Sequence, residues 1–70
     1  MFDYSKLKGR MKEKGITQET LANAIGKNKA TISLRLNNQS FFVQDEIAQI
    51  IKILEIPVDQ IKEYFFTSKV

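Results

Sequence analysis

The chain has 70 residues, enough for one small domain whose stability must come from its packed core. It has no cysteine and no histidine, which excludes disulfides and removes the commonest metal ligand and the commonest general base. The net charge is +3 and is unevenly spread, because residues 1–38 hold eight basic and three acidic residues, whereas residues 39–70 hold three basic and five acidic ones.

The charge distribution and the lengths of the apolar runs narrow the kinds of partner that the protein could bind. The basic half favours a polyanion such as nucleic acid, although a solvated surface without any partner gives the same count. No apolar run approaches the roughly 20 residues that cross a bilayer, and the N-terminal sequence lacks the pattern of a secretory signal. We therefore expect a cytoplasmic protein with no membrane contact, no metal, no cofactor and no small-molecule ligand.

Apolar residues recur at helical spacings and predict five short helices. The first covers about residues 4–14, with Asp3 as its N-cap and Gly15 as its stop. The basic residues on its opposite face are expected to be mostly solvated. These residues are Lys6, Arg10 and Lys14.

The second predicted helix covers about residues 18–25, and the third covers about residues 29–37. Thr17 and Asn28 are suitable N-caps, because their side-chain oxygens can accept hydrogen bonds from free backbone N–H groups. Only residues 26–28, which begin with a glycine, separate the two helices. Two short helices joined by a brief turn that contains glycine are typical of a helix-turn-helix motif.

A fourth helix is predicted over residues 44–54. This segment carries apolar residues at the i, i+3, i+4 and i+7 positions, which indicates a helix packed on the core. Phe41 and Phe42 precede it, and we expect both to cover the core.

Pro57 introduces a shorter fifth helix over about residues 58–64, in which Val58 and Ile61 are expected to point inward. The tail, residues 65–70, has no clear pattern, although residues 64–70 could form a short strand.

The helix-turn-helix segment meets the packing requirements of the motif. Ala22 is small where the two helices cross, Gly26 permits a positive φ at the turn, and Ile32 anchors the second helix. With these features, residues 17–38 (TQETLANAIGKNKATISLRLNN) resemble the DNA-binding domains of the lambda-type repressor and Cro family of phage regulators. The resemblance continues through DEIAQIIKILEIPVDQI and covers most of residues 4–64.

The resemblance implies an all-α, five-helix lambda-repressor-like domain over residues 1–70. It also implies a transcriptional regulator of the Cro or short-repressor type that binds a pseudo-palindromic operator in double-stranded DNA through the major groove. Because one recognition helix reads only a few base pairs, we expect a homodimer. The tail, residues 65–70, is the expected dimer contact through Phe65 or Phe66, and the alternative is that both fold onto the core.

The site residues follow from the positions that match the family and from their chemistry. A lysine can donate to guanine, alanine and leucine can contact a thymine methyl, and short polar side chains suit phosphate oxygens. The predicted base contacts are Lys29, Ala30, Ser33 and Leu34. The predicted phosphate contacts are Gln18, Asn28, Arg35 and Asn37.

Two positions depart from the family pattern. Arg35 stands where a bulky apolar residue is usual, so Leu36 is expected to anchor the helix and leave Arg35 to reach phosphate. Asn38 stands where glycine is common, and asparagine also tolerates a positive φ. Two alternatives stay open: Lys29 as an ordinary solvated lysine, and Leu34 as partly buried against neighbouring aromatic residues.

A second function is compatible with the same fold. A protein-interaction module, such as an antitoxin or an antirepressor, would fit a chain of this length equally well, whereas the basic N-terminal half favours DNA. An enzyme has no support, since the sequence offers no catalytic histidine or cysteine, no glycine-rich phosphate loop and no paired carboxylates in a plausible cleft.

Overall fold

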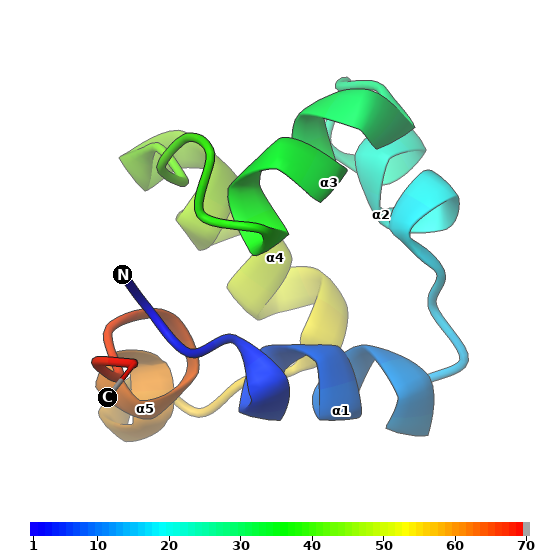
Figure 1. Ribbon diagram of the computed structural model, residues 1–70. Helices are drawn as coiled ribbons and strands as arrows, with labels where there is room; N and C mark the ends of the chain where they lie inside the picture. Colours follow the sequence, from blue (N-terminus) through cyan, green and yellow to red (C-terminus); the bar gives the residue numbers. More distant parts are fainter. Residues whose placement is uncertain (70) are drawn as a thin grey trace.

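The computed structural model describes residues 1–69, and its helices surround a single core. In chain order the elements are α1 (Ser5–Glu13), α2 (Gln18–Ala24), α3 (Lys29–Leu36), α4 (Gln44–Leu54), a 3-10 turn η1 (Val58–Gln60) and α5 (Ile61–Phe65). Figure 1 shows α2 and α3 above α1, with α4 crossing behind them and α5 beside α1 near the chain ends. The predicted all-α, five-helix fold is confirmed.

Each α-helix contributes two buried apolar residues to the core. Their spacing of four residues within α1, α3 and α4, and their adjacency in α2 and α5, place each pair on the inward side. The ten residues are Leu7, Met11, Leu21, Ala22, Ile32, Leu36, Ile50, Leu54, Tyr64 and Phe65.

The starts of α2 and α3 and the ends of α1 and α2 follow the predicted signals. The predicted N-cap of α1 is wrong, because Tyr4 and not Asp3 occupies that position, although the Asp3 side chain accepts from the Ser5 backbone N–H at 2.9 Å. The Thr17 side chain accepts a hydrogen bond from the backbone N–H of Thr20 at 3.1 Å, and the Asn28 side chain accepts one from the backbone N–H of Thr31 at 2.8 Å. Gly15 and Gly26 have φ values of 67° and 72°, the left-handed conformation that ends a helix at little cost for glycine.

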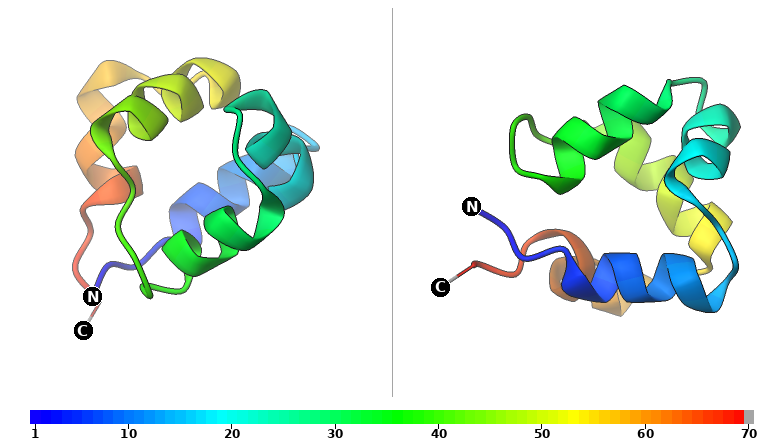
Figure 2. Two further views of the ribbon diagram at one scale, coloured as in Figure 1. Left: turned by 90° about the horizontal axis from the view of Figure 1, so that it is seen from above. Right: turned by 45° about the vertical axis from the view of Figure 1, so that its right-hand side comes forward.

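The N-terminal segment and the segment that follows α5 lie close together, as Figure 2 shows. Phe2 and Ser68 form an isolated antiparallel bridge, and the backbone N–H of Asp3 donates to the carbonyl of Thr67 at 2.7 Å. Within residues 1–69 the predicted strand of the tail is therefore reduced to this single bridge. Val70 lies outside the described residues.

Two predictions about the core are wrong. Val58 is 80% exposed, because the 3-10 turn before α5 leaves Ile56, and not Val58, in the core. Phe41 is 71% exposed, whereas Phe42 packs on the rings of Tyr4 and Phe65. Only one of the two adjacent phenylalanines can face the core in the extended segment before α4, since successive side chains there point to opposite sides.

Candidate nucleic-acid interface

The turn between α2 and α3 fixes the orientation of α3. Gly26 takes the positive φ that the turn needs, and the backbone N–H of Lys27 closes it by donating to the carbonyl of Ala22 at 2.8 Å. Ala22 and Ile32 are fully buried where the helices meet. With Ile32 and Leu36 turned inward, the opposite side of α3 must face outward.

That outward side carries the predicted base contacts. Lys29, Ala30 and Leu34 are exposed and Ser33 is partly buried. Leu34 is 44% exposed, so part of its side chain is available on this side of α3. The structure therefore brings the four residues together on the outward side of α3. This side carries one basic, one polar and two apolar side chains.

Three of the predicted phosphate contacts lie at the start of α2 and at the two ends of α3. Gln18 begins α2 and lines a hollow of about 360 Å³ together with Lys29. Asn28 uses its carbonyl oxygen as the α3 cap, which leaves its amide NH₂ for an external acceptor. Asn37 is exposed just past α3, and its amide donates to the Ser33 hydroxyl at 3.3 Å.

Arg35 does not fit the predicted phosphate role. Its Nε and Nη2 donate to the two carboxylate oxygens of Glu46 at 2.6 and 3.0 Å, and its Nη1 donates to the Ser40 hydroxyl at 2.7 Å. The Arg35 side chain is 16% exposed and the Glu46 side chain 1%. Arg35 therefore binds the end of α3 to α4, because its donors already have partners within the protein.

Glu46 is the buried end of this interaction. It also accepts from the backbone N–H of Val43 at 3.0 Å, so one carboxylate caps α4 and holds α3. Burial raises the pKa of Glu46, but the hydrogen bonds from Arg35 and Val43 outweigh it and hold the pKa below its ordinary value of 4.5. The sequence placed Glu46 only in the first turn of a helix and did not indicate this pairing.

The turn after α3 is attached to the N-terminal segment. Asn38 has a φ of 62°, as its sequence position predicted. Its side-chain amide accepts from the Phe2 backbone N–H at 2.7 Å and donates to the Phe2 carbonyl at 2.8 Å. The loop that follows α3 is thus held by residues 36 positions away in the chain.

The basic side of α1, which was expected to be solvated, is partly exposed, and its side chains also bond to α5 and to the end of α4. Lys6 pairs with Glu63, and Lys14 pairs with Glu55 at 3.0 Å. Arg10 donates from Nε to the Leu54 carbonyl and from Nη2 to the Glu55 carbonyl, each at 2.9 Å. These bonds satisfy backbone groups at the C-terminal end of α4.

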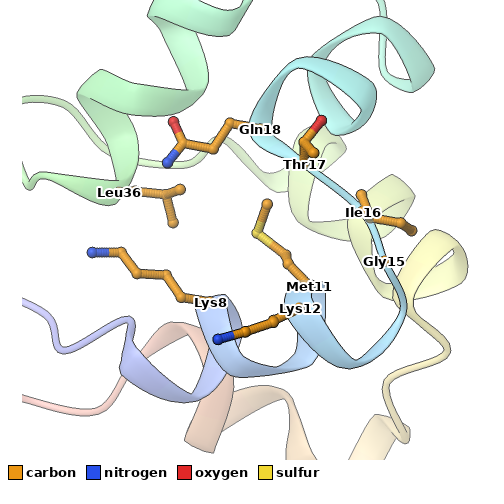
Figure 3. A pocket seen from close by; sticks show the side chains of 8 residues that line it. All are labelled: Lys8, Met11, Lys12, Gly15, Ile16, Thr17, Gln18 and Leu36. Atoms are coloured by element: carbon orange, nitrogen blue, oxygen red, sulfur yellow. The ribbon is translucent and has the colours of Figure 1, made fainter.

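A cleft lies between α1 and the pair α2 and α3, as Figure 3 shows. It has a volume of about 440 Å³. Its lining consists of Lys8, Met11, Lys12, Gly15, Ile16, Thr17, Gln18 and Leu36. Gln18 lines both this cleft and the hollow beside Lys29, so the two depressions adjoin.

The expected dimer residues differ in exposure. Phe65 is 1% exposed and belongs to the core, so it does not offer the dimer contact that was predicted for it. Phe66 is 48% exposed and packs edge-on against Phe2, which in turn contacts Phe41. We call Phe2, Phe41 and Phe66 the aromatic surface. They are among the residues that line an apolar hollow of about 260 Å³.

Within the described part of the chain, no group of three or more acidic side chains could hold a metal ion. None of the helices over residues 1–69 has the length and apolar character that crossing a bilayer requires.

Comparison with known proteins identifies relatives of the whole chain. A search of curated proteins found no match. The solution structure of the modulator of repression (MOR) of the temperate bacteriophage TP901-1 from Lactococcus lactis matches with a TM-score of 0.78. The two sequences are 40% identical, over 99% of this chain and 93% of that chain. The model of the family described as protein of unknown function (DUF739) matches residues 1–68, and the chain therefore belongs to this family.

Proposed function

We propose that this protein regulates repression in a temperate phage and does so by binding double-stranded DNA in a sequence-specific manner. The 40% identity to a phage modulator of repression supports the regulatory role. The observation that carries the DNA-binding part is the outward side of α3, where Lys29, Ala30 and Leu34 are exposed. Arg35 and Asn38 hold α3 in place against α4 and the N-terminal segment, so this side projects from a braced helix.

In this proposal α3 enters the major groove as a recognition helix. Lys29 donates to a guanine edge, Ala30 and Leu34 contact thymine methyl groups, and Ser33 contacts a base or phosphate. Gln18, Asn28 and Asn37 bind phosphates and set the register, whereas Arg35 acts only inside the protein.

Selection of bound duplexes from a random library, carried out at two salt concentrations, tests this proposal. Sequence-specific binding as a dimer should enrich a pseudo-palindrome, and the affinity should fall steeply as salt rises. If no sequence is enriched and no salt-dependent binding is seen, the DNA-binding function is refuted.

Lys29→Ala tests the assigned base contact. On the selected duplex the loss should be about 1–3 kcal/mol, with relaxed preference at one base position. Lys52→Ala, an exposed α4 lysine, removes the same charge as a control and should change the affinity little. A loss from Lys29→Ala that is equal across all duplex sequences would show a phosphate contact instead.

We further propose that the protein forms a homodimer through the aromatic surface. Phe41 and Phe66 are exposed beside an apolar hollow, and Phe2 links them. A two-fold contact would let an exposed ring of each copy enter the hollow of the other. Apolar surface of this kind on a small protein typically marks an interface.

Sedimentation equilibrium of Phe66→Asp at high protein concentration tests the dimer. The charged variant should be monomeric where the wild type associates, because a carboxylate cannot be buried in that contact without a partner. Val58→Asp, at a position that is 80% exposed and outside the aromatic surface, is the matched control and should behave as wild type. Equal association of Phe66→Asp and wild type would refute the proposed contact.

The second candidate function is a protein-interaction module. The aromatic surface favours it, because recognition of one DNA half-site does not require exposed phenylalanines. In this case the partner would be another regulatory protein, and Phe66→Asp would abolish its binding without affecting DNA. The duplex selection distinguishes the two candidates.

A further inference from the structure

The basic residues of α1 fall into two groups with different surroundings. Lys6, Arg10 and Lys14 each pair with a carboxylate of the protein. Lys8 and Lys12 are exposed, and neither takes part in an ion pair among residues 1–69. One side of α1 is therefore paired with carboxylates of the protein, whereas the lysines of the other side have no ion-pair partner among residues 1–69.

The two lysines without an ion-pair partner share one site. They are four residues apart, which places them on the same side of α1, and both line the 440 Å³ cleft described above. In Figure 3 the amine ends of Lys8 and Lys12 and the amide of Gln18 point toward the same side of this cleft. Among residues 1–69 no carboxylate lines it, and its floor includes the buried side chains of Met11 and Leu36.

The cleft is continuous with the proposed DNA interface. Gln18 lines the cleft on one side and, on the other, the hollow that contains Lys29. Hydrogen-bond donors therefore follow one another from α1, through the start of α2, to the first turn of α3. Glu19 is the acidic residue at this hollow, so the two depressions together hold three lysines and one carboxylate.

We propose that the cleft between α1 and α2 binds the sugar-phosphate backbone of the DNA strand that flanks the groove occupied by α3. Lys8 and Lys12 donate to consecutive or neighbouring phosphates, Gln18 donates between them and Lys29, and the apolar floor contacts deoxyribose. Ammonium groups form strong charge-assisted hydrogen bonds to phosphate oxygens. This inference rests on the proposed DNA-binding function and adds α1 to its contact surface.

The test compares two double variants that remove equal charge. Lys8→Ala/Lys12→Ala alters the cleft, whereas Lys52→Ala/Lys62→Ala alters exposed lysines of α4 and α5 that line neither depression. Binding is measured by fluorescence anisotropy with a labelled duplex selected by the wild type, over a series of salt concentrations. Circular dichroism and thermal melting establish that both variants are folded.

The cleft variant should reduce the slope of log affinity against log salt by roughly 1.8, since each lost phosphate contact removes about 0.9. At moderate salt this corresponds to a loss of about tenfold or more in affinity. The control variant should keep the wild-type slope. In addition, Glu19→Gln should strengthen binding, because it removes a negative charge near the same strand.

Four results would overturn the inference. A wild-type slope for the cleft variant, in a protein that still binds the selected duplex, would refute the cleft contact and leave the proposed function intact. Equal slope changes in both double variants would show a general charge effect. If the cleft variant bound DNA normally but lost binding to a labelled poly-glutamate peptide, the cleft would be a site for acidic protein segments. Absence of any duplex binding by the wild type would refute the proposed function and this inference together.

Discussion

Arg35 and Glu46 form the most deeply buried of the ion pairs among residues 1–69. Their two parallel hydrogen bonds satisfy both carboxylate oxygens, and Ser40 and Val43 complete the arrangement. A pair of this kind is costly to break from one side, because the remaining charge stays buried without its partner. Replacing both residues by apolar ones costs much less.

The different costs of removing one partner and of replacing both give a prediction for the free energy of unfolding. Arg35→Met should lower the free energy of unfolding by about 3 kcal/mol, since it leaves the Glu46 carboxylate buried and unpaired. Arg35→Met/Glu46→Leu should recover most of that loss. Urea unfolding followed by circular dichroism measures both, with Lys29→Met on the same helix as the exposed control, which should change stability by less than about 0.5 kcal/mol. Equal stability of Arg35→Met and Lys29→Met would show that the pair contributes nothing.

At the scale of elements, the helices were predictable because their signals are local. The apolar spacing of α4 gave its bounds, Gln44–Leu54, and the caps Thr17 and Asn28 marked the starts of α2 and α3. The short turn with Gly26 between α2 and α3 was equally visible, since its positive φ depends on one residue. Where neighbours along the chain determine the structure, the sequence alone is sufficient.

The candidate site was predictable only in part, because contacts between distant segments determine which side chains are available. The exposed positions of α3 followed from its helical period and from Ile32. By contrast, Arg35 is bound by Glu46, Phe65 packs against Phe42, and the partly exposed basic side of α1 also bonds to α4 and α5. No local pattern distinguishes Lys8 from Lys6, and their different roles appear only when the helices are packed.

At the scale of the whole molecule, three acidic residues lie where different segments of the chain meet, and the pKa values of all three are lowered. Hydrogen bonds from Ser5 lower the pKa of Asp3 below 3.8, next to the N-terminal segment. Lys14 lowers the pKa of Glu55 below 4.5 where α1 meets the end of α4. For Glu46, between α3 and α4, burial acts in the opposite direction but is outweighed by Arg35 and Val43, and the pKa falls below 4.5.

A group with a lowered folded-state pKa stabilises the protein above its unfolded-state pKa, and this contribution is lost as the pH falls through the folded-state value. The urea midpoint should therefore be nearly constant between about pH 5.5 and 8, where the chain has no histidine to titrate, and should decrease below about pH 4.5. Unfolding curves followed by circular dichroism from pH 3 to 8 test this expectation. Glu46→Gln should start from a lower midpoint and lose less on acidification, because its side chain has no proton to take up. A wild-type midpoint that stays constant down to pH 3, or that rises on acidification, would show that stability does not depend on the ionised form of these three carboxylates.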